Sequence, residues 1–230
     1  MKFCSIIITH WGNTPERSEI MRKSIDSLFS SLDYPSEVIV IDNGTSIEDS
    51  EHLLKLTTEG KIQHYIRNAS NMSFGYARNQ GIKLSHGEYL CIADNDLIYQ
   101  KGWLSECIKV LEAFPNEKYY TTPMPYQANR KFDKGTLTLN EKVYNLNSRA
   151  GSNCFVIRRS DMDNIGHFIY HRIAGSKWTD KATRLGYLAV VIPNHWVEDI
   201  GFRNGYDFTK VIPISLKLTD GTIINLNQDI

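Results

Sequence analysis

The sequence predicts an α/β fold: a mostly parallel central sheet flanked by helices, with a C-terminal β-hairpin extension. In the first half of the chain, short runs rich in β-branched residues alternate with segments whose apolar residues recur at helical spacing. The links are short, which favours right-handed crossovers between parallel strands. Three of the apolar runs also end directly in polar residues. Because ligands of such sheets bind at the carboxyl ends of the strands, this pattern predicts a functional site there.

Four apolar runs are the expected strands of the first half: KFCSIIIT, SEVIVID, the weaker KIQHYIR, and GEYLCIAD. Three segments between them are the expected helices: TPERSEIMRKSIDSLFSSL, IEDSEHLLKLTTEG and FGYARNQGIKLSHG. Pro15 beside Thr14 suits the start of the first helix, and Gly60 and Gly87 suit the ends of the other two.

The alternation weakens in the second half, after a helix in GWLSECIKVLEAF and a strand at residues 119–123. Residues 124–150 are polar, aromatic and turn-rich, which predicts an acceptor-facing loop or insertion. GSNCFVIRR and YLAVVIPN are expected strands, and GSKWTDKATRLGY is an expected short helix. The tail ISLKLTDGTIINL predicts a hairpin around Asp220-Gly221, which either covers a sheet edge or makes a homodimer contact.

Composition narrows the classes of function. Lysine plus arginine equals aspartate plus glutamate at 26 each, so no overall charge favours nucleic acid or an anionic membrane. The four cysteines form no CxxC pair and lie mostly in apolar runs. No apolar run approaches the roughly 20 residues of a membrane span, and the first strand lacks a cleavage site. We expect a soluble, cytoplasmic protein, with peripheral membrane attachment as the alternative.

Asp94-Asn95-Asp96 interrupts two apolar runs in YLCIADNDLIYQKGW. One interpretation is a helix N-cap, since aspartate caps well, but four residues separate the pair from the next expected helix near Lys101. The other interpretation is a hard-cation site of DxD type. There the carboxylates hold Mg2+ or Mn2+, and a bound phosphate adds oxygen ligands. A diphosphate leaving group requires that positive charge.

Asp42, Arg78 and His195 are further candidates. Asp42 ends VIVID and is either a turn former or an acceptor of hydrogen bonds from a nucleoside. Arg78 is either a surface ion-pair partner or a bidentate ligand of a diphosphate. His195 is either structural or a metal ligand. A nicotinamide cofactor is not expected, because ITHWGNTPE has a single glycine where those folds carry a glycine-rich fingerprint.

In their order along the chain, these segments resemble the inverting family 2 of glycosyltransferases, which has the GT-A fold for nucleotide-diphospho-sugars. The resemblance covers roughly residues 3–201 and rests on SIIITH, VIVIDNGT, NMSFGYARNQGI, GEYLCIADNDLIYQKGWL, GSNCFVIRRSDMDNIGHF and RLGYLAVVIPNHWVEDIG. It implies a GT-A catalytic domain over 1–205, with a nucleotide-binding half, 1–100, and an acceptor-side half, 101–205. A hairpin tail, 206–230, follows.

The resemblance implies a role for each matched donor-site residue. Thr9 and Asp42 would face the nucleoside, with Asp42 on the base. Arg78 would lie near the diphosphate or the donor sugar. Asp94 would contact the ribose or the sugar, and Asn95 belongs to the same donor site.

The resemblance also implies a metal site and a sugar site. Asp96 would bind Mn2+ or Mg2+ directly, and His195 would complete the metal or diphosphate site. Residues 151–155 would lie near the transferred sugar.

The catalytic base is where this chain departs from the family. Inversion by single displacement needs a carboxylate that removes the proton of the acceptor hydroxyl. Relatives usually place it in a Glu-Asp pair about a dozen residues before a Gly-Tyr such as Gly186-Tyr187. In this chain that spacing falls on Ala174-Gly175, which carry no carboxylate.

Asp180 is the nearest acid and the first candidate for the base. An equally good interpretation is a solvated helix-face aspartate paired with Lys181 or Arg184. Glu198 and Asp199 are the next candidates.

The leading hypothesis is a metal-dependent transferase that moves a sugar from a nucleoside-diphosphate sugar, most commonly a UDP-sugar in this family, to an acceptor hydroxyl. One alternative is a nucleotidyltransferase of related fold, although its usual glycine-rich loop is absent. Another is a weak or inactive sugar-nucleotide-binding partner subunit, which the missing Glu-Asp pair suggests. A glycan, a lipid-linked sugar, a protein and a modified nucleic acid all stay open as acceptors.

Overall fold

The computed structural model describes residues 2–124, 134–170, 173–194 and 196–201. It also describes the backbone of two short strands near the C-terminus, β12 (Ser215–Lys217) and β13 (Ile223–Asn225). His195, one of the predicted site residues, lies outside the described residues.

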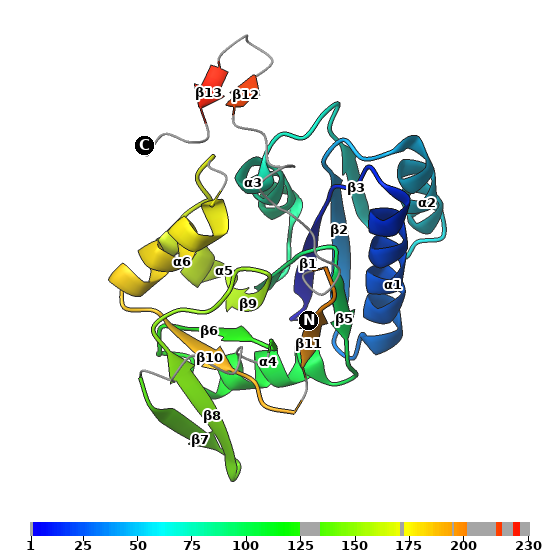
Figure 1. The fold of residues 1–230 in the computed structure, drawn as a ribbon. Helices are drawn as coiled ribbons and strands as arrows, with labels where there is room; N and C mark the ends of the chain where they lie inside the picture. The colour runs from blue at the N-terminus through cyan, green and yellow to red at the C-terminus, as the bar shows by residue number, and fades with distance from the viewer. Residues whose placement is uncertain are drawn as a thin grey trace.

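One nine-stranded sheet forms the centre of the molecule (Figure 1). Its strands, in spatial order, are β3 (His64–Arg67), β2 (Ser36–Asp42), β1 (Cys4–His10), β4 (Tyr89–Ala93), β9 (Cys154–Arg158), β6 (Tyr119–Thr122), β10 (Leu188–Val191), β8 (Lys142–Asn147) and β7 (Thr136–Leu139). The strand pairings make β9 and β8 run opposite to the others. The predicted, mostly parallel sheet with flanking helices is confirmed.

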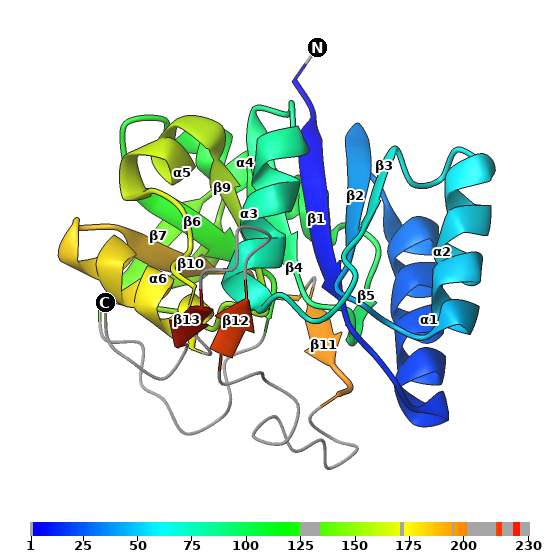
Figure 2. The ribbon, with the colours of Figure 1, turned by 90° about the horizontal axis from the view of Figure 1, so that it is seen from above.

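Helices cover both faces of this sheet. One layer contains α1 (Pro15–Ser31), α2 (Ile47–Thr58) and α4 (Trp103–Ala113), and the other contains α3 (Phe74–Leu84), α5 (Arg159–Ile165) and α6 (Ala174–Arg184). Figures 1 and 2 show α1 and α2 on one side of β1 and β2, and α3 on the other. Successive side chains of β1 point to opposite faces of the sheet, so Ile6 and Ile8 pack against the first helix layer and Ile7 against the second.

Helix starts and ends follow local chemistry, with one exception. The side chain of Thr14 accepts a hydrogen bond from the backbone N–H of Arg17, and Pro15 occupies the first helical position of α1. Gly60, at φ +74°, follows the end of α2 as predicted. Gly87 does not end α3, which stops at Leu84. A β-carbon on Gly87 would lie 2.7 Å from the backbone of β1, so this glycine permits close approach of two chain segments.

The predicted acceptor-facing loop or insertion spans residues 124–150, of which residues 125–133 lie outside the described residues. Residues 134–150 are not an irregular loop, and the insertion stays a prediction. They contain the antiparallel pair β7–β8, in which Leu139 faces Lys142. The two intervening residues, Asn140 and Glu141, both have positive φ, 49° and 65°, as a two-residue hairpin turn requires. The turn residues are not the common Asn-Gly type, so the sequence signal for this hairpin is weak.

The residues after Asp96 form a strand rather than the approach to a helix. β5 (Leu97–Tyr99) pairs with β11 (Val197–Asp199), and α4 starts after Gly102. The N-cap interpretation of the DxD segment is therefore wrong. Near the C-terminus, β12 and β13 pair antiparallel as predicted. The division at residues 100 and 205 stays a prediction, as does the role of the hairpin tail.

All four cysteines are buried and free, and burial raises the pKa of the Cys4, Cys91 and Cys107 thiols. They act as small apolar side chains of the core. None of the helices in the described part of the chain combines the length and the apolar character that crossing a bilayer demands.

Leu53 and Leu54 provide a matched test of the core. Leu53 is fully buried under the sheet, whereas its neighbour Leu54 is 52% exposed. Leu53→Ala should lower the free energy of unfolding by about 2–5 kcal/mol, because it leaves a cavity. Leu54→Ala should change it by less than about 0.5 kcal/mol. Denaturant unfolding measures both, and equal effects would contradict the packing of α2 described above.

Candidate active site

Polar side chains collect at the carboxyl ends of three neighbouring strands, as the sequence predicts. β1 lies between β2 and β4, with His10 beside Asp42 and Ile8 beside Ala93 in register. The residues that follow β4 therefore lie at the same edge as the end of β2. β11 adds another acid, Asp199, next to the strand that follows Asp96.

Asp42 is fully buried and both of its carboxylate oxygens are engaged. Oδ1 accepts hydrogen bonds from the backbone N–H groups of Gly44 and Thr45 at 3.1 and 2.8 Å. Oδ2 accepts from the hydroxyls of Ser50 and Tyr65 at 2.6 and 2.8 Å. Asp42 thus holds the turn after β2, which agrees with its turn-forming interpretation. Its contact with a nucleoside base stays a prediction that would require one of these bonds to be exchanged.

Asn95 points away from solvent into a buried network around His10. Its side-chain nitrogen lies 2.5 Å from His10 Nδ1, and His10 Nε2 lies 3.1 Å from Thr45 Oγ1 and 3.5 Å from Asp49 Oδ2. The Asn95 amide donates, so Nδ1 accepts and the ring proton belongs on Nε2. His10 thereby connects the DxD segment to α2. The sequence by itself predicted no role for His10.

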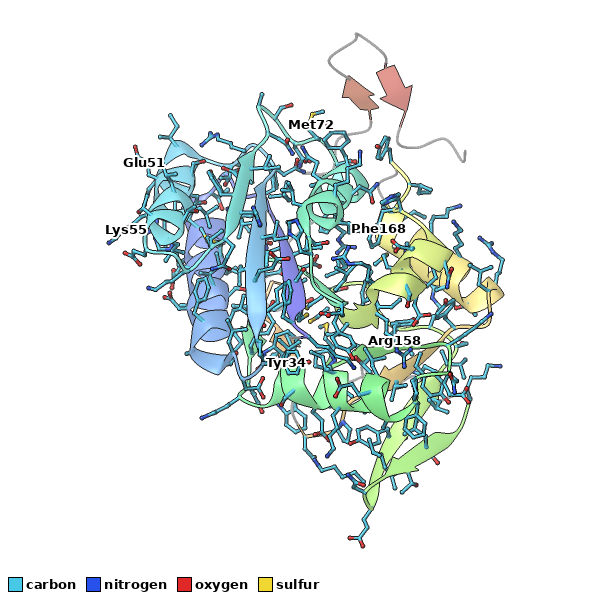
Figure 3. All side chains as sticks on the ribbon, turned by 180° about the vertical axis from the view of Figure 1, so that it is seen from behind. Tyr34, Glu51, Lys55, Met72, Arg158 and Phe168 are labelled. Carbon is cyan, nitrogen blue, oxygen red and sulfur yellow. The ribbon has the colours of Figure 1, made fainter. Side chains whose placement is uncertain are left out.

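Arg78 and Asp94 form a hydrogen-bonded ion pair whose cation is fully buried. The guanidinium Nη2 donates to Asp94 Oδ1 at 2.7 Å and to the Ser152 carbonyl at 3.0 Å. The rings of Phe74 and Phe168 lie 4.6 and 5.1 Å from the guanidinium carbon. Figure 3 labels Phe168 beside α3. The side chain is 1% exposed, and its Nε and Nη1 have no hydrogen-bond partner among the described residues. Arg78 is therefore a buried cation with two nitrogen atoms that donate no hydrogen bond to the described residues, and it is not the partner of a surface ion pair.

Asp96 is also buried and is incompletely compensated. Its Oδ2 lies 3.4 Å from Arg17 Nη1, and its Oδ1 accepts no hydrogen bond from another described residue. A β-carbon on Gly201 would lie 2.0 Å from Oδ2, so the chain after β11 passes directly over this carboxylate. Only glycine allows that approach.

The pKa values of Asp94 and Asp96 are both raised. Burial is the largest cause of the raised pKa of Asp94, followed by opposition from Arg78 and then the charge of Asp96. Burial also raises the pKa of Asp96 most, with Asp199 adding to it and Arg17 opposing it. Asp199 accepts a hydrogen bond from Asn153 at 3.0 Å. Such a concentration of negative charge favours a cation or a cationic transition state.

The position of the missing Glu-Asp pair lies beside Arg78. A β-carbon on Gly175 would lie 3.3 Å from Arg78 Nη1, and only 1.9 Å from the Ser152 hydroxyl oxygen. Ser152 thus occupies the space of a side chain at residue 175. The packing of Ser152 against Gly175 therefore leaves no room for an acidic side chain at residue 175 in this arrangement.

The remaining predicted residues have different surroundings. Asp180 is 40% exposed and pairs with Arg149 at 2.7 Å, so its ion-pair interpretation holds with a different partner from those expected. Glu198 follows Val197 on β11, on the opposite face from its neighbour Asp199. Thr9 is buried, and its hydroxyl has no hydrogen-bond partner among the described residues.

Comparison with known proteins identifies the family. The family model described as glycosyl transferase family 2 matches residues 5–177. The chain belongs to glycosyl transferase family 2. An uncharacterized glycosyltransferase of Rickettsia bellii is 34% identical over 90 residues, which are 39% of this chain and 13% of that protein. The resemblance drawn from the sequence is confirmed.

Solved structures support the GT-A fold. The TarS 1-349 structure from S. aureus covers 86% of this chain at a TM-score of 0.64 and 19% identity. The structure of GalNAc-T7 with UDP, GalNAc and Mn2+ covers 86% of this chain at a TM-score of 0.69 and 14% sequence identity. The structure of the mannosyltransferase PcManGT of Pyrobaculum calidifontis with GDP-Man and Mn2+ covers 83% of this chain at a TM-score of 0.66 and 16% sequence identity. The matches span 59%, 44% and 55% of those three chains.

If Arg78 and Asp94 compensate each other's charge, removing the Asp94 charge should recover part of the stability that is lost when Arg78 is replaced. Arg78→Met should lower the free energy of unfolding by about 3–5 kcal/mol, because it strands a buried carboxylate. Adding Asp94→Asn should restore part of that loss. The exposed pair Lys23–Glu19 is the control, and Lys23→Met should cost at most about 1 kcal/mol. Additive losses in the Arg78→Met/Asp94→Asn protein would contradict this pairing.

Proposed function

We propose that the protein is a metal-dependent inverting glycosyltransferase that moves a sugar from a nucleoside-diphosphate sugar to an acceptor hydroxyl. The observation that carries the proposal is the buried edge where Asp94, Asp96 and Asp199 lie together with Arg78. The pKa values of Asp94 and Asp96 are raised there, and Arg78 has two nitrogen atoms, Nε and Nη1, with no hydrogen-bond partner among the described residues. Membership of glycosyl transferase family 2 supports the reaction class.

Asp96 is the residue that best fits a divalent cation. Its buried Oδ1 accepts no hydrogen bond from the described part of the chain, and carboxylate oxygen is a preferred ligand of Mg2+ and Mn2+. His195, which lies outside the described residues, stays the second predicted ligand. A bound cation would neutralise charge that develops on the departing diphosphate. Mn2+ in the GalNAc-T7 and PcManGT structures supports this choice.

Arg78 and Asp94 fit the donor's phosphate and sugar. Arg78 is held by Asp94 and Ser152 through Nη2, which leaves Nε and Nη1 to donate to an anionic ligand. Its rigid placement between two aromatic rings lowers the entropy lost on binding. Asp94 in turn would accept from a ribose or sugar hydroxyl with its second oxygen. Thr9 offers a hydroxyl for the nucleoside.

Three acids are candidates for the base. Asp180 was the first choice from spacing, but it already pairs with the cation of Arg149. Asp199 lies near the other two carboxylates and Asn153, which favours it on geometry. Glu198 is the third candidate.

The donor is proposed to be a UDP-sugar. Structures of TarS with UDP and with UDP-GlcNAc, and of PcManGT with GDP-Man, support a nucleotide sugar and leave uridine and guanosine to be compared. A glycan, a lipid-linked sugar, a protein or a modified nucleic acid is the proposed acceptor class. A cytoplasmic location is also proposed, and the four free cysteines support it.

A sugar-nucleotide-binding partner without activity is the second candidate. The observation that favours it is Ser152 packed against Gly175, where the family places acids. Consumption of UDP- or GDP-sugars by the purified protein, with and without Mn2+, separates the two. Nucleotide binding without donor consumption would favour the partner. Release of sugar 1-phosphate instead of the nucleoside diphosphate would favour a nucleotidyltransferase, which attacks phosphorus.

Asp96→Asn should weaken Mn2+-dependent UDP binding by at least about tenfold, because it removes a charged metal ligand. Calorimetry with and without Mn2+ measures the change. Asp163→Asn, at an exposed acid of α5, is the matched control and should bind as the unaltered protein does. An unchanged Mn2+-dependent affinity in Asp96→Asn would remove Asp96 from the metal site.

Asp199→Asn and Asp180→Asn identify the base. The variant that lacks the base should bind UDP normally while donor turnover falls by about 10²–10⁴-fold. We expect this result for Asp199→Asn and near-normal turnover for Asp180→Asn. The reverse result would return the base to Asp180, and normal turnover in both would direct the search to Glu198.

A further inference from the structure

A second cluster of side chains that can bind a metal lies at the amino ends of β2, β3 and β4, opposite the carboxyl ends that carry the proposed active site. Glu37 is near the start of β2, His64 begins β3, and His86 precedes β4. Figure 3 shows the two edges, with Met72 at the carboxyl ends and Tyr34 at the amino ends of these strands. Asp42 lies five residues after Glu37, which is about 17 Å along β2. The cluster is therefore separate from the proposed active site.

The two imidazoles converge on one carboxylate oxygen. His64 Nε2 lies 3.6 Å from Glu37 Oε2, and His86 Nδ1 lies 3.7 Å from the same oxygen. One ligand atom from each residue lies within 4.8 Å of the other two. Tetrahedral Zn2+ with these ligands holds its donor atoms about 3.3 Å apart. Small side-chain rotations would close the difference.

The other oxygen of Glu37 is held in place by the protein. Oε1 accepts hydrogen bonds from the Ser5 hydroxyl at 2.5 Å and from the backbone N–H of His86 at 2.7 Å. Outer contacts of this kind orient a metal-ligating carboxylate. The second bond also places His86 itself, because donor and ligand belong to the same residue.

Charge and exposure at the cluster suit a cation that enters from solvent. Burial would raise the pKa of the Glu37 carboxyl, but hydrogen bonds from Ser5 and His86 and the two imidazoles hold it below its usual range. The carboxylate is thus charged at neutral pH. The side chain of Glu37 is 12% exposed, whereas those of His64 and His86 are 37% and 69% exposed. The outer histidine provides the entry path.

We propose that Glu37, His64 and His86 form a binding site for a transition-metal ion of the Zn2+ class, with water as the fourth ligand. Imidazole nitrogen with one carboxylate selects Zn2+, Co2+ or Ni2+ over Mg2+ and Ca2+, which prefer oxygen ligands. A metal there ties β2, β3 and the segment before β4 together. Its role is structural or regulatory, because the cluster lies far from the donor site.

Co2+ titration of the full chain tests the site. The protein carries no polyhistidine tag, is stripped with chelator and is kept in excess Mg2+ to occupy the carboxylate edge. We expect one Co2+ per chain with the visible absorption of a four-coordinate ion, displaced by Zn2+. His64→Gln and His86→Gln should each weaken Co2+ binding at least about tenfold. Zn2+ should also raise the melting temperature of the unaltered protein.

Two controls make the test specific. His167→Gln removes an exposed histidine outside the cluster, and Asp96→Asn alters the carboxylate edge. Both should retain the Co2+ spectrum. His86 is largely exposed, so His86→Gln keeps the test valid even where His64→Gln lowers stability. A titration without four-coordinate absorption, or equal Co2+ affinity in the His64→Gln/His86→Gln protein, would overturn the proposal.

Discussion

The close grouping of three carboxylates, of which Asp96 is buried and Asp94 and Asp199 are partly exposed, is the constraint on which the rest of this strand end depends. Asp94 and Asp96 follow β4 directly, and β11 brings Asp199 beside them. Like charges at such a place would repel, so each needs compensation from another element. Arg78 comes from α3 and Arg17 from α1, on opposite faces of the sheet. The strand end is thereby connected to both helix layers.

Small residues allow this edge to be so densely packed. Gly201 lets the chain pass over Asp96, and Gly175 lets α6 meet Ser152 and Arg78. Each would place a β-carbon within 2.0 Å of a neighbouring side-chain atom. The absence of an acid at residues 174 and 175 accompanies the close approach of α6 to Ser152. A base from another element fits this arrangement better than a restored acid in α6.

The two edges of the sheet carry different ligand chemistry. At the carboxyl ends the donors are carboxylate oxygens and guanidinium groups, which suit a hard cation and a diphosphate. At the amino ends two imidazoles face a single carboxylate, which suits a softer metal. Parallel strands separate these edges by the strand length, so ligands at one edge do not contact those at the other.

By itself, the sequence determined the alternation of strands and helices in the first half, the DxD at a strand end and the family, because hydrophobic period and motif order are local properties of the chain. It could not resolve the β7–β8 hairpin, whose turn, Asn140-Glu141, has no strong signal. Only the tertiary structure decided that both carboxylate oxygens of Asp42 accept hydrogen bonds and that Asp180 pairs with Arg149. It also decided that Asp199 lies close to Asp96. Those outcomes depend on contacts between residues far apart in the chain, and spacing along the sequence does not encode such contacts.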